Sequence, residues 1–179
     1  MRVAVIGGGR VGGGLAELWR AAGHDVRVSE RETVTETAAF GDVILLAVPA
    51  AARRDVVARL GSLEGKVLID ATNDLRREYD GAGSEDLVSA SPVVKAFNTV
   101  FATLYDEIAM SGRPPSMVYC GDDAAAKETT ATLIRDAGFE PIDVGGLEQT
   151  PDLAAFARLV TGIAYRQGRG PFVYRFEAP

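Results

Sequence analysis

The chain has 179 residues, of which 47% are hydrophobic and 25% charged, and its formal net charge is −6 at pH 7. This length and composition predict a single domain over 1–179 with a hydrophobic core of its own. The acidic balance repels a phosphate backbone, so we expect no nucleic-acid partner.

Two other classes of protein, disulfide-stapled and membrane-spanning, are also disfavoured. The single cysteine leaves no internal disulfide to form, which is typical of a reducing compartment. No apolar run approaches the roughly 20 residues of a membrane helix, so we expect no membrane partner. The first predicted strand starts at Arg2 and leaves no room for a signal peptide, and we therefore predict a cytoplasmic protein.

Apolar runs and helical periodicity alternate along the chain. The runs predict strands at 3–6, 26–28, 43–48, 67–69, 93–97, 117–120 and 141–144, and a final edge strand at 172–176. Apolar residues at helical spacing predict helices at 11–22, at 50–60, from about 121 to 137, and at 153–164. The polar segment 76–84 is interpreted as a surface loop.

Strands that alternate with helices indicate βαβ units with right-handed crossovers. We therefore predict an α/β fold: a Rossmann-type, doubly wound, mostly parallel sheet with a short C-terminal helical extension at about 147–179. The last predicted helix carries an apolar stripe from Leu153 to Ala164. The stripe favours a homodimer, and the alternative is that it simply packs on the sheet.

A glycine-rich turn follows the first predicted strand and opens the first predicted helix. Gly7, Gly9 and Gly12 satisfy G-x-G-x-x-G in the strand–turn–helix context of dinucleotide-binding folds. Gly7 permits the tight turn, Gly9 lets the backbone approach a pyrophosphate, and Gly12 lets helix and strand pack closely. Free N–H groups near Arg10 and Val11 would bind the pyrophosphate. The competing interpretation is a merely structural turn.

The end of the second predicted strand carries conflicting signals for NAD and NADP. Glu30 lies 18 residues after Gly12, where an acidic side chain accepts hydrogen bonds from the adenosine ribose and favours NAD. Arg31 follows at once and favours NADP, because a guanidinium pairs with a 2′-phosphate. Ser29 adds a hydroxyl. We predict NADP, with NAD kept open because of Glu30.

Ligands of open α/β sheets bind outside the carboxyl ends of the strands. That rule selects Ala47-Val48-Pro49, Thr72-Asn73 and Asn98-Thr99. Val48 and Pro49 would wall the nicotinamide side of the cofactor. Its ribose or carboxamide would be bound by Asn73, Asn98 and Thr99, although the asparagines are equally well explained as turn formers.

Few side chains offer acid–base or metal chemistry. His24, the only histidine, lies in the turn before the second predicted strand and is predicted to be structural. Cys120 is expected in the core, and Lys95 is expected as a buried or edge charge. Asp122 and Asp123 are predicted to cap a helix. We therefore predict no metal site and no catalytic side chain.

Six segments, spread over nearly the whole chain, carry a resemblance to a known family. They are VAVIGGGRVGGGLAELWRAAGHDV, ILLAVP, KVLIDATND, SPVVKAFNT, VYCGDD and GPFVYRFE, of which SPVVKAFNT is the most specific. Together they resemble the NADP oxidoreductase, coenzyme F-420-dependent family. That family includes deazaflavin:NADP reductases and the cytosolic domains of the STEAP metalloreductases.

The resemblance implies a Rossmann domain that passes hydride between NADPH and a flavin or deazaflavin. It implies pyrophosphate binding by Gly7, Gly9, Arg10, Val11 and Gly12, and nicotinamide-side contacts by Val48, Pro49, Asn98 and Thr99. Two positions depart from the family pattern. Glu30 precedes Arg31 where NADP-dependent members often have serine or threonine, and Asn98 stands where deazaflavin reductases have histidine.

We therefore predict an NAD(P)H-dependent oxidoreductase that transfers hydride to a flavin, a deazaflavin or another small acceptor. Positioning of two rings would supply the rate without a side-chain acid or base. Two alternatives stay open. One is a carbonyl or imine reductase, which needs a proton donor near the substrate, and the other is a non-catalytic NAD(P)-binding or sensing module.

Overall fold

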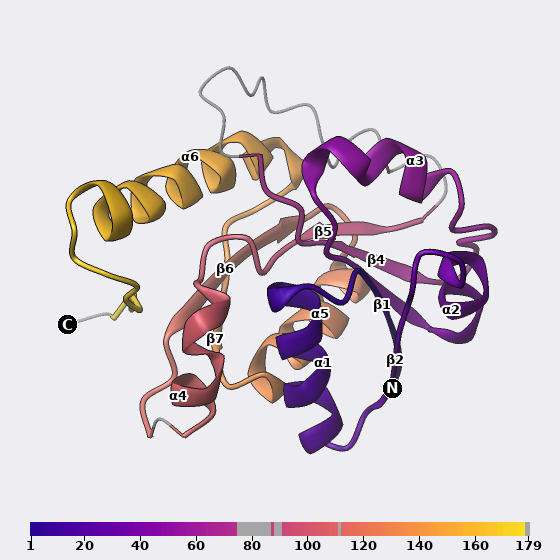
Figure 1. Cartoon of the computed structure of the whole chain (residues 1–179), viewed down its shortest axis with the longest axis horizontal. Coiled ribbons are helices and arrows are strands. Elements are labelled where there is room, and N and C mark those ends of the chain that lie inside the picture. Colours follow the sequence, from indigo (N-terminus) through magenta and orange to yellow (C-terminus); the bar gives the residue numbers. More distant parts are fainter. Residues whose placement is uncertain (75–86, 88–90, 111, 178–179) are drawn as a thin grey trace.

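The strands of the computed structural model form one sheet of seven, in the order β2-β1-β3-β4-β5-β6-β7 (Figure 1). Their bounds are β1 (Arg2–Ile6), β2 (Asp25–Val28), β3 (Val43–Leu46), β4 (Val67–Asp70), β5 (Val93–Lys95), β6 (Ser116–Gly121) and β7 (Glu140–Asp143). The structure describes residues 1–74, 87, 91–110 and 112–177. The loop predicted at 76–84 lies outside the described residues.

Neighbouring strands are parallel except at β5 and β6, which pair antiparallel. The strand order reverses at β1, which lies between β2 and β3. In open sheets of this kind, ligands bind in the crevice outside the carboxyl ends of the two strands at the reversal, which here are β1 and β3. The predicted α/β, doubly wound and mostly parallel sheet is confirmed.

Helices cover both faces of the sheet because both faces of its strands are apolar. Odd-numbered residues of β1 and β3 pack with α1 (Arg10–Ala21), α4 (Tyr105–Ala109) and α5 (Ala124–Asp136). Even-numbered residues of the same strands pack with α2 (Val34–Phe40) and with α3 (Arg53–Val57) and the residues that follow it. Short 3₁₀ turns lie at Ala50–Ala52, Ala102–Leu104 and Leu147–Gln149.

The last helix, α6 (Thr150–Thr161), continues into a π-helical turn at Gly162–Arg166. Leu153 of α6 packs against Val118 and Cys120 of β6. Leu153, Ala157, Val160 and Ala164 of the predicted apolar stripe are buried within this chain, whereas Leu159 and Tyr165, which lie outside the stripe, are 59% and 60% exposed. The homodimer and the single domain over 1–179 stay predictions.

Three helical segments differ from the sequence prediction, and one of them, the five-residue α4, was not predicted. The helix predicted at 50–60 is a 3₁₀ turn followed by the five-residue α3. Helix α2 was not predicted, because VTETAAF is short and rich in β-branched residues that weaken helix propensity.

Three strand predictions also differ. The third predicted strand, 43–48, ends at Leu46 in β3, because the chain turns toward Pro49, which has no N–H to donate to a ladder. The strand predicted at 93–97 ends at Lys95, because Phe97 adopts a left-handed conformation with φ 63°. The segment 172–176 is not a strand, since the N–H of Phe176 is donated to the Ser116 hydroxyl rather than to a ladder.

The packing of α4 on α1 generates a stability prediction. Gly14 of α1 makes room for the Tyr105 ring, because a Cβ at Gly14 would lie 2.7 Å from Tyr105 Cδ2. The Tyr105 side chain is buried, and its hydroxyl has no hydrogen-bond partner among the described residues. A buried unpartnered hydroxyl costs roughly 1–3 kcal/mol.

We expect Tyr105→Phe to leave the free energy of unfolding unchanged or to raise it by about 1 kcal/mol. Urea denaturation would measure it. The matched control is Tyr174→Phe, where the deleted hydroxyl is bonded to Thr99, and this variant should lose about 1 kcal/mol. A loss of stability for Tyr105→Phe as large as that of the control would contradict the assignment.

Candidate functional site

The glycine turn brings the start of α1 close to the end of β3. Gly7 has φ 110°, and a Cβ there would lie 2.4 Å from the Ala47 carbonyl oxygen. A Cβ at Gly12 would lie 2.0 Å from the Gly7 carbonyl oxygen. Both positions therefore need glycine for the protein's own packing, as the sequence predicted for the turn and for the helix contact.

Gly9 has a different environment. A Cβ there would have no protein atom within 4 Å, so no contact inside the described chain requires glycine at this position. Gly9 is also the N-cap residue of α1 and offers no side chain to bond the first helical N–H groups. A helix start without a side-chain cap leaves its first N–H groups to be satisfied by other partners, and a pyrophosphate is one that suits them.

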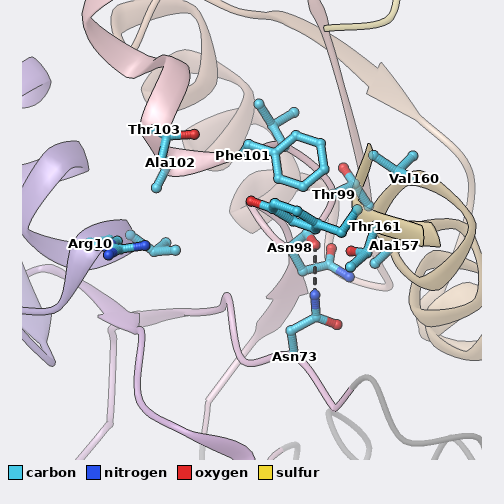
Figure 2. Close-up of a pocket in the computed structure, with 13 residues that line it drawn as sticks. Arg10, Asn73, Asn98, Thr99, Phe101, Ala102, Thr103, Ala157, Val160 and Thr161 are labelled. Carbon is cyan, nitrogen blue, oxygen red and sulfur yellow. Dashed lines mark hydrogen bonds between the residues drawn. The ribbon is translucent and has the colours of Figure 1, made fainter. Parts of the chain in front are cut away.

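A cavity of about 250 Å³ opens beside this helix end. Figure 2 shows Arg10 on one side of it, across from Asn73, Asn98 and Phe101. Its lining residues are Arg10, Val11, Asn73, Asn98, Thr99, Val100, Phe101, Ala102, Thr103, Ala157, Val160, Thr161 and Tyr165. The start of α1, the segments that follow β4 and β5, and α6 therefore meet at one hollow.

The cavity gathers part of the predicted site. Arg10, Val11, Asn73, Asn98 and Thr99 all line it. Two other predicted groups lie outside its lining. Ala47 and Val48 instead lie against the glycine turn, and Pro49 follows them at the surface. The Ser29-Glu30-Arg31 group follows β2, beyond the strand-order reversal.

The two asparagines share an unusual bonding state. The Asn73 Nδ2 group donates to the Asn98 carbonyl at 3.0 Å, drawn as a dashed line in Figure 2. The Asn98 Nδ2 group donates to the Leu153 carbonyl of α6 at 3.4 Å. Both Oδ1 atoms are buried and have no partner among the described residues. The wall of the cavity therefore holds two acceptors without donors.

The Thr99 side chain contacts Tyr174 of the C-terminal segment. Its hydroxyl lies 2.6 Å from the Tyr174 hydroxyl and 3.9 Å from the sulfur of Met117. Burial raises the pKa of Tyr174 to about 12, so its phenol stays protonated at neutral pH. Sequence reasoning missed Tyr174, and the one signal for it was the terminal GPFVYRFE segment.

The backbone between β5 and Asn98 is strained. Phe97 is the only non-glycine residue with positive φ in the described part of the chain, and its ring is buried against Trp19. Left-handed conformations of bulky residues cost of order 1–3 kcal/mol and cluster at functional sites. This turn places Asn98 and Thr99 in the cavity wall.

A second cation, Arg59 from the segment after α3, reaches the loop after β2, and sequence reasoning missed it. The Glu30 N–H donates to Thr33 Oγ1 at 3.0 Å, which fixes the turn, and the side chains of Glu30 and Arg31 are exposed. The Arg59 guanidinium donates to the Arg31 carbonyl. No sequence pattern links residues that are 28 positions apart in this way.

The predicted structural residues have structural contacts. His24 pairs with Asp136 of α5 at 2.9 Å. Burial raises the pKa of the Cys120 thiol to about 11, so it is not an activated nucleophile. Asp123 caps α5 by accepting the Ala126 N–H, as predicted. The capping prediction for Asp122 is wrong, because its carboxylate reaches across to the Leu147 N–H at 2.8 Å.

Over the described ranges, no helix is long and apolar enough to cross a membrane. In the same part of the chain, no group of three or more histidine, cysteine or carboxylate side chains gathers as a metal site would require.

With the site described, comparison with known proteins becomes informative. Residues 30–74 match the family described as NADP oxidoreductase, coenzyme F420-dependent. The resemblance to this family is confirmed. The rat metalloreductase STEAP3 is 28% identical over 175 residues, which cover 86% of this chain and 36% of the relative. The chain thus spans about a third of the length of that relative.

Solved structures share the fold. A candidate F420-dependent NADP reductase from Arthrobacter sp. FB24 superposes with a TM-score of 0.83 at 21% identity, over 98% of this chain and 99% of that one. An imine reductase from Streptomyces aurantiacus has a TM-score of 0.70 at 15% identity, and this chain covers 61% of it. The coarse class predicted from the sequence, an NADP-dependent oxidoreductase, agrees with the family description.

Proposed function

We propose that the chain binds NADP(H) and transfers hydride between the nicotinamide and a planar acceptor of the flavin or deazaflavin type. One observation carries the proposal. Asn73 and Asn98 line the cavity beside the start of α1, and each carries a buried amide oxygen without a donor among the described residues, while Phe101 and Tyr165 add aromatic rings to the lining. The first feature suits a nicotinamide carboxamide and the second suits a flat acceptor.

The residues present fit a bound dinucleotide. The open space at Gly9 and the first N–H groups of α1 would take the pyrophosphate. The Oδ1 atoms of Asn73 and Asn98 would accept the two hydrogens of the carboxamide amide, which ends their unpartnered state. Pyrophosphate and carboxamide would then be held on opposite walls of one hollow.

The acceptor side of the cavity is apolar and aromatic. The Phe101 and Tyr165 rings meet edge to face, with centroids 5.6 Å apart. Ala157 and Val160 of α6 complete this wall. A bound NADPH supplies a hydride from its nicotinamide ring, so the chain's task is to hold two rings in contact and to exclude water.

For the choice of cofactor, we propose NADP. Arg31 lies beside the end of β2, and Arg59 adds a second guanidinium at the same loop. Two cations against Glu30 favour a 2′-phosphate, and the family description names NADP. A cytoplasmic location and a homodimer remain proposals that rest on sequence alone.

A carbonyl or imine reductase is the second candidate, and one observation favours it. Tyr165 lines the cavity, and its hydroxyl is the one phenol among the described lining residues. Such reductases need a proton donor beside the substrate. The third reading, a binding module without catalysis, predicts cofactor affinity with no turnover.

The first prediction concerns Gly9. Gly9→Val should weaken binding of both NADH and NADPH by at least about a hundredfold, because the side chain would fill the space for the pyrophosphate. Calorimetry would measure affinity, and a melting curve should show an intact fold. The matched control is Gly112→Val, which also adds a side chain to open space. Unchanged affinity in Gly9→Val would overturn dinucleotide binding by this turn.

The second prediction concerns selectivity. Arg31→Ala should weaken NADPH binding about tenfold and leave NADH binding unchanged, because only NADPH carries the 2′-phosphate. Glu30→Ser should strengthen NADPH binding several-fold by removing a like charge. A wild type that prefers NADH tenfold, together with an unaffected Arg31→Ala, would establish NAD as the cofactor.

The third prediction tests the reaction. With 4-deuterated NADPH and a deazaflavin acceptor, the label should appear on the acceptor's C5, which does not exchange with water. His24→Ala and Cys120→Ala should keep activity within about tenfold, whereas Asn98→Ala should lose up to about a hundredfold through misplaced rings.

The pH dependence of the reaction rate can contradict the proposed hydride transfer without a proton donor. A bell-shaped profile with one limb lost in Tyr165→Phe would reveal an essential proton donor and move the protein to the carbonyl or imine reductases. Cofactor binding without oxidation by deazaflavin, flavin or simple imines would instead favour the binding module.

A further inference from the structure

A buried ion pair lies behind the cavity and takes no part in the proposed hydride transfer. Asp70 ends β4 and Lys95 ends β5, and the sheet register places them side by side. Lys95 Nζ lies 3.2 Å from Asp70 Oδ2, and the two side chains are 3% and 0% exposed. An Arg53 nitrogen lies 4.0 Å from the same oxygen. Neither Asp70 nor Lys95 lines the cavity.

The pair holds both backbone groups of Thr72. Asp70 Oδ1 accepts the Thr72 N–H at 2.8 Å, and Lys95 Nζ donates to the Thr72 carbonyl. Thr72 lies beyond β4, where no ladder partner fixes its peptide groups. Two side chains from neighbouring strands therefore replace the sheet ladder at this residue.

Asn73 follows the clamped residue directly. Its Nδ2 group donates to the Asn98 carbonyl, and its Oδ1 atom is left without a partner at the cavity wall. Figure 2 shows the Asn73 side chain extended from its loop toward Asn98. A side chain of a loop residue keeps such a direction only if the backbone beneath it is fixed.

Stability does not account well for the pair. Burying two charges carries a desolvation cost that often cancels their attraction, and apolar residues of similar size stabilise as well or better. What apolar residues cannot do is accept one backbone N–H and donate to one backbone carbonyl of the same residue. The distinctive contribution of Asp70 and Lys95 is therefore to fix the conformation at Thr72.

We propose that Lys95 and Asp70 are positioning residues. They hold the Thr72–Asn73 turn so that Asn73 Oδ1 accepts a hydrogen bond from the N–H of the nicotinamide carboxamide. This inference rests on the proposed function. It has two consequences. Lys95 affects cofactor affinity only through Asn73, and it affects binding of only the nicotinamide half of the cofactor.

A double-mutant cycle tests both consequences, with affinities measured by calorimetry for NADPH and for 2′,5′-ADP, which carries only the adenosine half. Asn73→Ala and Lys95→Met should each weaken NADPH binding about tenfold. The double variant should be no more than about twofold weaker than Asn73→Ala alone. Affinity for 2′,5′-ADP should stay within about twofold of the wild type in every variant.

Lys127→Met is the matched control. Lys127 also pairs with an aspartate, Asp143, at 2.7 Å, and also donates to a backbone carbonyl, that of Gly145. Lys127 does not line the cavity, so its replacement should change neither affinity. If Lys95→Met fails to fold, Asp70→Asn combined with Lys95→Met removes both charges of the pair and takes its place in the cycle.

Three results would overturn the inference: wild-type affinity in Lys95→Met, full additivity with Asn73→Ala, or an equal loss of 2′,5′-ADP binding. Failure of the proposed function would give a different result: the wild type would bind neither NADPH nor 2′,5′-ADP. If the wild type binds both and Asn73→Ala binds NADPH equally well, only the proposed Asn73 contact is contradicted.

Discussion

The close approach of the glycine turn to the end of β3 is the constraint on which the site depends. A Cβ at Gly7 or Gly12 would lie within 2.4 Å of a backbone oxygen, so side chains at either position would push α1 away from the sheet. With glycines there, α1 starts beside the reversal of strand order between β1 and β3. Arg10 and Val11 at that helix end line the cavity.

Around this contact the structure tolerates several locally unfavourable features. The Oδ1 atoms of Asn73 and Asn98 are buried without partners, which costs roughly 1–3 kcal/mol each. Phe97 adopts a left-handed conformation one residue before Asn98. A charged pair is buried beneath Thr72. These features gather at the ends of β4 and β5, and such concentration is typical of a binding site.

The sequence predicted what depends on local pattern. Strand–turn–helix spacing located the glycine turn, and apolar runs located the strands of a mostly parallel sheet. It could not predict contacts between residues far apart, such as the bond between Thr99 and Tyr174, 75 positions away. The approach of Arg59 to Arg31 is of the same kind.

Other differences arise where tertiary structure overrides a local signal. An apolar run continues through Phe97, yet the backbone turns left-handed there and β5 ends at Lys95. Residues 172–176 were predicted as a final edge strand, but the Phe176 N–H donates to the hydroxyl of the Ser116 side chain. Lys95 was predicted only as a buried or edge charge, because its pairing with Asp70 depends on the register of β4 and β5.

The position of α6 bears on what kind of acceptor the cavity suits. Leu153 packs on β6, and its carbonyl accepts the Asn98 amide at 3.4 Å, so the helix is fixed both to the sheet and to the proposed nicotinamide wall. Ala157 and Val160 of the same helix line the cavity and would form the proposed acceptor side. An imine substrate is small and needs a site that closes around it and supplies a proton. A planar ring needs one flat apolar wall at a fixed distance from the nicotinamide, and a short helix fixed at two points is sufficient to provide that.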